Sequence, residues 1–98
     1  MTFIQTIDIH TTKFDEINEI EQRWRAATEG KRTLRRSILT RDRNDPDHYV
    51  ILAFFDSYES AMENSNLPET GEFGAQQAAL ADRPLQFMDL EVLAEEDG

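Results

Sequence analysis

Residues 49–55 form an unbroken run of apolar and aromatic side chains, Tyr-Val-Ile-Leu-Ala-Phe-Phe. The run is much shorter than the ~20 residues of a membrane-spanning helix, but it matches a β-strand, whose side chains point alternately to two faces. Both faces of this strand therefore require an apolar cover. Residues 85–93 show a similar pattern, with Met88 and Leu90 opposed to Phe87. The fold must bury a sheet on both sides.

A helix that can cover one of these faces follows a first strand. Residues 2–10 alternate between apolar and polar positions, which predicts a strand. Thr12 is the predicted N-cap of the helix, with Asp15 three positions later, and Gly30 is the predicted end. The apolar stripe of this helix recurs at helical spacing: Phe14, Ile17, Ile20, Trp24 and Ala27.

A hairpin is predicted next. Residues 33–41 and 48–55 are the two strands, and residues 42–47, Asp-Arg-Asn-Asp-Pro-Asp, are a short polar linker that contains proline. Such a linker is typical of an antiparallel connection.

Two helices and a last strand complete the predicted elements. Asp56 or Ser57 caps the first of these helices. It ends near Pro68, because proline cannot continue the backbone hydrogen-bond ladder. Thr70 is the predicted cap of the second, short helix, and residues 85–93 are the last strand.

This order, β-α-β-β-α-β, predicts an α+β fold of the ferredoxin-like type, with the helices on one face of a four-stranded sheet. We expect a single domain over residues 1–98, with residues 94–98 as a frayed tail. The helices cover one face only, and the strands are apolar on both. A second copy of the chain is therefore expected to cover the other face, as a homodimer.

Composition excludes several classes of partner. The formal net charge of −10 disfavours nucleic acid, because an acidic surface repels phosphates. The absence of cysteine excludes disulfides and thiolate metal ligands, and it fits a cytoplasmic location. The start of the chain has no basic segment followed by an apolar run, so we expect no secretory signal. No apolar stretch has the length of a membrane span, so no membrane partner is expected.

Residues 41–62 resemble the antibiotic biosynthesis monooxygenase family of small dimeric α+β-barrel proteins. The shared pattern is a polar hairpin, a strand rich in aromatic residues, and a serine or acidic start to a helix that contains Glu-x-Ala. Here that start is Ser57-Tyr58-Glu59-Ser60-Ala61. Residues 64–70, with Phe73 and Ala75, are similar to an uncharacterised actinobacterial-type branch of the family.

The resemblance implies a barrel of two sheets and, in each subunit, a cavity between the sheet and its helices. Members of the family include oxygenases of aromatic polyketides that use no metal or flavin, and enzymes that degrade haem. Haem-degrading relatives have an iron-ligating histidine in the region of residues 64–80, where this sequence has none. Phe55 occupies a position where many members have tryptophan. We therefore expect no cofactor.

The candidates for catalysis lie on the first and third strands. Asp8 and His10 share one face of the first strand and would form an oriented base; the alternative is a hydrogen-bonded surface role. Tyr49 has a hydroxyl that would orient a phenolic substrate. His48 is expected to be a simple turn residue. Two histidines without a paired ligand spacing predict no metal site.

The candidates for ligand binding are aromatic and amide side chains. Tyr49, Phe55 and Tyr58 would line an aromatic pocket, or else pack as ordinary core. Asn64, near the end of its helix, would point into the cavity mouth.

Arg36 is the remaining ligand-binding candidate. It shares a face with Leu34 and Ile38. A buried arginine would need an anionic partner, and Asp8 is a candidate for it.

Two functions remain open on this evidence. The first is a cofactor-independent monooxygenase that acts on an aromatic or polyketide-like compound. The alternative is a non-catalytic homodimer of the same fold that binds a small molecule or a partner.

Overall fold

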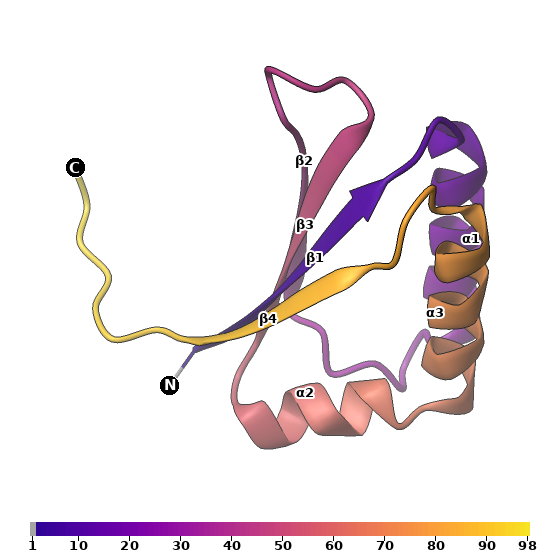
Figure 1. The fold of residues 1–98 in the computed structure, drawn as a ribbon. Coiled ribbons are helices and arrows are strands. Elements are labelled where there is room, and N and C mark those ends of the chain that lie inside the picture. Colours follow the sequence, from indigo (N-terminus) through magenta and orange to yellow (C-terminus); the bar gives the residue numbers. More distant parts are fainter. Residues whose placement is uncertain (1) are drawn as a thin grey trace.

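A computed structural model describes residues 2–98 as an antiparallel sheet with helices packed on one face (Figure 1). The sheet order is β2-β3-β1-β4. This arrangement confirms the predicted ferredoxin-like α+β class. Two successive helices, rather than one, connect the third strand to the fourth. The elements are β1 (Phe3–His10), α1 (Phe14–Ala27), β2 (Arg36–Arg41), β3 (His48–Phe55), α2 (Tyr58–Ser65), α3 (Pro68–Leu80) and β4 (Gln86–Glu91).

The register of the strands divides their side chains between two faces. Ile7 of the central strand β1 pairs with Ile51 of β3 and with Phe87 of β4, and these side chains share the face that carries the helices. We call it the helix face. Thr6 pairs with Leu52 and Met88 on the other face, which we call the open face.

The core lies on the helix face. Its buried cluster comprises Phe3, Ala53, Phe55 and Ala61, with Leu34 and Met62 packed against it. From α1, the predicted stripe buries Ile17, Ile20 and Trp24, whereas Ala27 is exposed.

The open face carries apolar side chains, and the helices of residues 2–98 all lie on the other side of the sheet (Figure 1). Met88 on β4 is 55% exposed and Leu90 is 37% exposed. β3 is therefore apolar on both faces, as predicted. The helices cover one of these faces, and the other is uncovered. The apolar side chains of the open face are Ile4, Ile38, Val50, Leu52, Phe54, Met88 and Leu90.

Two predicted helix caps are wrong. The N-cap of α1 is Lys13 rather than Thr12. The hydroxyl of Thr11 accepts the Lys13 N–H at 2.9 Å and donates to the Leu80 carbonyl at 2.8 Å, so Thr11 ties the start of α1 to the end of α3. α3 begins at Pro68, whose missing N–H costs nothing in the first turn. Thr70 therefore lies inside α3.

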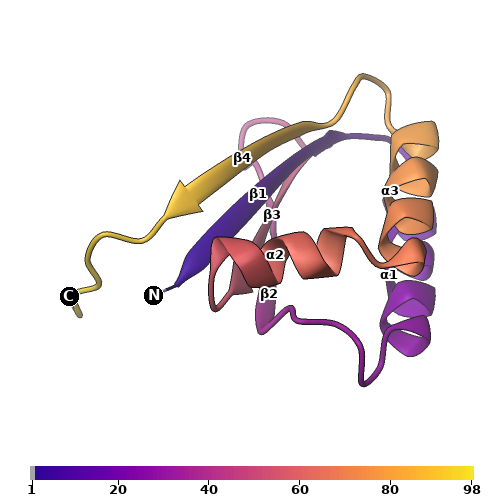
Figure 2. The same cartoon turned by 90° about the horizontal axis from the view of Figure 1, so that it is seen from below.

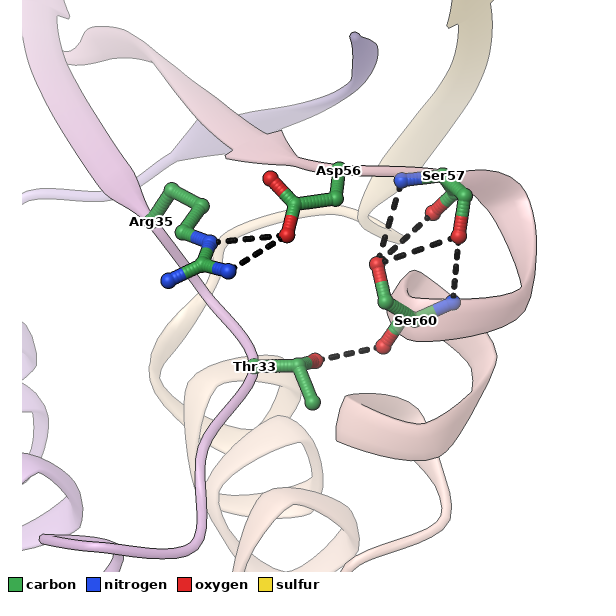
Figure 3. Close-up of polar contacts among 5 residues, drawn as sticks. All are labelled: Thr33, Arg35, Asp56, Ser57 and Ser60. Carbon is green, nitrogen blue, oxygen red and sulfur yellow. Dashed lines mark hydrogen bonds and ion pairs between the residues drawn. The ribbon is translucent and has the colours of Figure 1, made fainter. Parts of the chain in front are cut away.

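The α2 start is fixed by short-range polar contacts. Ser57 caps α2 as predicted: its hydroxyl accepts the Ser60 N–H, and the Ser60 hydroxyl accepts the Ser57 N–H (Figure 3). Arg35 donates two hydrogen bonds to Asp56, which raises the pKa of Arg35 and lowers that of Asp56.

β2 begins at Arg36, three residues later than predicted. The reason is that Thr33 is bound to α2 instead of β3. Its hydroxyl donates to the Ser60 carbonyl (Figure 3), and its N–H donates to the side chain of Asn64. Seen from below, α2 runs from the strands toward the pair formed by α1 and α3 (Figure 2). Among residues 2–98, no helix is long and apolar enough to cross a bilayer.

Candidate functional site

The inward stripe of α3 is too small and too polar to fill the space beneath it. It consists of Thr70, Phe73, Gly74 and Gln77, at the i, i+3, i+4, i+7 spacing of one helix face. Gln77 is the only buried residue of the helix. A Cβ atom added to Gly74 would meet no atom within 4 Å. A space therefore remains between α3 and the sheet.

This space is a cavity of about 270 Å³. Its apolar wall comes mainly from the helix face of the sheet, and α1, α2 and α3 add polar groups. The volume is near the lower end of ligand pockets, which span roughly 300–1,000 Å³. The cavity is lined by Gln5, Ile7, Glu21, Trp24, Leu34, Ser37, Ile51, Ala53, Phe55, Asn64, Ser65, Thr70, Phe73, Gly74, Gln77 and Phe87.

Asn64 brings a rigidly held amide to the cavity. It is 6% exposed, and its Oδ1 accepts the Thr33 N–H at 3.2 Å. This hydrogen bond occupies the oxygen end of the amide. Nδ2 of Asn64 makes no hydrogen bond within residues 2–98, so two N–H donors are available at the cavity.

Gln77 has a buried donor without a partner. The residue is 3% exposed, and its Nε2 has no hydrogen-bond partner within residues 2–98. More than nine in ten buried polar groups are hydrogen-bonded in native proteins, because an unpaired one costs about 1–3 kcal/mol. The Gln77 side chain also borders a neighbouring cavity of about 230 Å³, which shares Glu21, Ser37 and Ile51 with the first.

Glu21 is the only ionisable side chain in the cavity lining. Arg25, one turn later on α1, donates to its Oε1 at 2.6 Å and to the Ser37 hydroxyl at 2.8 Å. The Arg25 guanidinium thus links α1 to the edge strand β2 and holds the Glu21 carboxylate in place.

Trp24 forms a fixed wall between the two long helices. Its indole N–H donates to Thr70 Oγ1 at 3.0 Å, and its ring stacks on Phe73 at 5.5 Å between centroids. The apolar stripe that predicted a buried Trp24 does not reveal this direct contact with α3.

Of the predicted ligand-binding residues, Phe55 and Asn64 line the cavity. Tyr49 is buried on the helix face, but it stacks on Phe14 at 4.6 Å and is not among the lining residues. Tyr58 is 52% exposed and contacts Phe3 edge to face, so it also lies outside the cavity. The predicted aromatic trio is therefore not brought together in one pocket.

The expected partnership of Arg36 with Asp8 is wrong. Arg36 is exposed at the start of β2, and its guanidinium lies over the Phe54 ring at 5.5 Å. The physical reason is that β2 and β1 are separated by β3 in the sheet. Asp8 bonds to His48 instead.

Asp8 does not bond to His10, because a residue on the next strand is better placed. His48 Nε2 lies 2.5 Å from Asp8 Oδ1, and His48 Nδ1 lies 3.1 Å from Asp42 Oδ2. The His10 ring stacks flat on His48 at 4.2 Å. His48 is therefore not a simple turn residue.

This histidine pair lies at the hairpin end of the open face, on the opposite side of the sheet from the cavity. The hydrogen bond that Asp8 accepts, and then that which Asp42 accepts, raise the pKa of His48. The pKa of Asp42 is lowered, chiefly by the Asn44 N–H and then by His48. Within residues 2–98, no three histidine, aspartate or glutamate side chains are grouped as metal ligands.

Sequence reasoning missed Gln77 and Glu21 as site residues. The available signal was in α3, where an inward stripe with glycine and glutamine in place of large apolar residues indicates incomplete packing. On α1, Glu21 follows the apolar Ile17 and Ile20 at the edge of the buried stripe.

No family model matches the sequence, and no curated protein matches it. Solved structures with the same fold do exist. SnoaB, a cofactor-independent oxygenase from Streptomyces nogalater, is 14% identical, with 96% of this chain and 94% of SnoaB covered and a TM-score of 0.78. A structure described as an antibiotic biosynthesis monooxygenase is 12% identical, covers 96% and 100% of the two chains, and has a TM-score of 0.75.

A third similar structure is a dimeric ferredoxin-like protein of unknown function from Jannaschia. It is 14% identical, covers 94% of this chain and 100% of the other, and has a TM-score of 0.77. Identities this low establish a shared fold. They confirm the fold class that the resemblance of residues 41–62 implied, since a solved structure named for that family has it.

Proposed function

We propose that this chain binds a flat aromatic or polyketide-like molecule in the cavity beneath α3 and oxidises it with molecular oxygen, without a metal or organic cofactor. The observation that carries the proposal is the pair of free amide donors, on Asn64 and Gln77, beside an apolar wall. An apolar pocket with few convergent polar groups is the usual form of a small-molecule site. The fold shared with SnoaB supports the reaction type.

The chemistry requires a substrate that is itself a reductant. In an anthrone-type compound, a CH₂ group loses a proton to give a carbanion, and its charge spreads to the ketone oxygen. Reaction with O₂ converts CH₂ to C=O, and the second oxygen atom leaves as water. Preorganised N–H donors at the ketone oxygen stabilise the charge that develops there. Asn64 and Gln77 are placed for this role, and Glu21 is the lining group that could accept the proton.

An oxygen electrode with an anthrone substrate tests this proposal. Asn64→Leu should lower kcat by about tenfold or more, because an oxyanion donor is lost. Tyr49→Phe is the matched control and should leave turnover unchanged, since Tyr49 lies outside the cavity lining. Absence of O₂ uptake above the uncatalysed rate, across anthrones and hydroquinones, would refute oxygenation.

A non-catalytic binding protein is the second candidate. It is favoured by the positions of Asp8, His10 and Tyr49, the predicted catalytic residues, all of which lie outside the cavity lining. In this case an anthrone or quinone would raise the Tm of the protein without O₂ uptake. The two measurements on one sample distinguish the candidates.

We further propose that the functional unit is a homodimer closed through the open face. Burial of each large apolar side chain contributes roughly 1.5–3 kcal/mol, and this face presents several of them at once. The Jannaschia protein of the same fold is described as dimeric. Two helix-covered sheets packed on their open faces would form the barrel.

A further inference from the structure

We infer that Glu21 and Gln77 determine which ligand the cavity accepts: a neutral, compact ring system with a hydroxyl group at one edge and a ketone at another. The inference rests on the proposed ligand cavity and names its substrate class. In this inference, side chains of α1 and α3 recognise the ligand. The sequence had suggested tyrosine and arginine side chains for that role.

Gln77 supplies the requirement for the ketone. Its buried Nε2 has no acceptor within residues 2–98, and the Gln77 side chain is part of the lining of both cavities. A ligand that presents a carbonyl oxygen would satisfy this donor and remove the cost of leaving it unpaired. A ligand without an acceptor gains nothing there.

Glu21 supplies the requirement for the hydroxyl and for neutrality. Its carboxylate can only accept hydrogen bonds, so it matches a phenolic O–H. No cation is among the residues that line the main cavity, and Arg25, which borders the neighbouring one, is already bonded to Glu21 and Ser37. A carboxylate ligand would therefore meet the Glu21 charge without a free counter-charge in the cavity.

The two groups reach the cavity from different helices. Glu21 comes from α1 and Gln77 from α3, and the opposite wall is the apolar surface of Ile7, Ile51 and Phe87. A planar ring lying on this surface would present its edge to both helices. The cavity volume of about 270 Å³ suits a compact ring system.

Four bicyclic probes separate the two requirements. 6-Hydroxy-1-tetralone has both groups, the 6-methoxy analogue lacks the donor, tetrahydronaphthol lacks the ketone, and the 6-carboxylate analogue is an anion. Affinity is measured by quenching of Trp24, which is the single tryptophan and lines the cavity. We expect the hydroxy-ketone to bind about threefold to tenfold more tightly than tetrahydronaphthol. Because Glu21 is charged, we expect at least about a tenfold advantage over the methoxy analogue.

Gln77→Leu tests the ketone requirement. This variant should lose the preference for the ketone and keep the preference for the hydroxyl. It should also raise the stability of the ligand-free protein, because a buried unpaired donor is removed. A purely structural glutamine would give a less stable variant. Gln76→Leu, on the exposed side of the same helix, is the matched control and should leave all four affinities unchanged.

Glu21→Met tests the other requirement. It should lose the preference for the hydroxyl over the methoxy probe and admit the carboxylate probe, because Arg25 is released. If either folded variant keeps the ligand preference that it should lose, the inference is wrong. The proposal that the cavity binds a ligand would still stand. If no probe quenches Trp24 in the unmodified protein, the proposed ligand cavity itself fails, and the inference fails with it.

Discussion

His48 has a carboxylate at each of its ring nitrogens, Asp8 at Nε2 and Asp42 at Nδ1. Ionised carboxylates only accept hydrogen bonds, so both nitrogens must donate, and the ring is an imidazolium. This agrees with the raised pKa of His48. The folded state therefore binds this proton more tightly than the unfolded chain does.

The stability of the protein should consequently depend on pH through His48. The stabilisation is fully present below the unfolded-state value of about 6.5 and is lost as pH rises through the higher folded-state pKa. The Asp42 contribution has the opposite sign. It is present above about 3.8 and is lost as pH falls through the lowered pKa. The arrangement stabilises the fold most between these limits.

Urea unfolding at a series of pH values checks this prediction. The free energy of unfolding of the unmodified protein should fall as pH rises above about 6.5, and His48→Gln should flatten that fall. Asp45→Asn is the control, since Asp45 lies in the same linker and bonds to His48 only through its backbone carbonyl, which accepts the His48 N–H and is kept in the variant. An equal fall in His48→Gln and the unmodified protein would contradict the role of His48.

Alternation along β1 correctly places Asp8 and His10 on one face, but it cannot show which side chain is nearest. The partner of Asp8 comes from β3, 40 residues later. That pairing depends on the register between two strands, which no local pattern specifies. Arg36 illustrates the same limit, because its distance from Asp8 follows from the order of the strands.

At the scale of elements, α3 leaves the space that becomes the cavity. Gly74 faces this space, whereas Gly71, one turn earlier, is exposed. Replacing either glycine by leucine should add about 0.5–1 kcal/mol of helix stability, because glycine is a poor helix former. Only Gly74→Leu would also place an apolar side chain inside the cavity.

We therefore expect Gly74→Leu to be the more stable of the two variants and to abolish quenching of Trp24 by 6-hydroxy-1-tetralone. Gly71→Leu should bind that probe as the unmodified protein does. Unfolding by urea and fluorescence titration measure both effects. Unchanged binding in Gly74→Leu would show that the probe occupies another place.

The order of the elements and the hairpin could be predicted from periodicity, because these patterns are local. The cavity could not, since it depends on what three helices and a sheet jointly fail to fill. Phe55 and Asn64 could be predicted from an aromatic and an amide side chain near the cavity that the resemblance implied. Gln77 had no such guide, and its importance follows from the missing partner of its amide.

For the whole molecule, the proposed dimer depends on the open face. Leu52 lies at its centre, on a strand with neighbours on both sides. A lysine there would place a charge in the proposed interface, so Leu52→Lys should be a folded monomer in sedimentation experiments. Leu93→Lys is the control, because Leu93 is 91% exposed beyond β4, and it should remain dimeric. A folded monomer of the unmodified chain at high micromolar concentration would refute the dimer.

The scarcity of buried residues in α3 has a consequence for how a ligand enters. Apart from Gln77, this helix is attached mainly through its ends and through Trp24, by the bonds of Thr11 to Leu80 and of Trp24 to Thr70. Its amide protons should therefore exchange with deuterium sooner than those of β1 and β3, because little apolar surface resists local opening. A bound ligand would slow this exchange, because it would fill the space between α3 and the sheet. The ligand would then form part of the hydrophobic core.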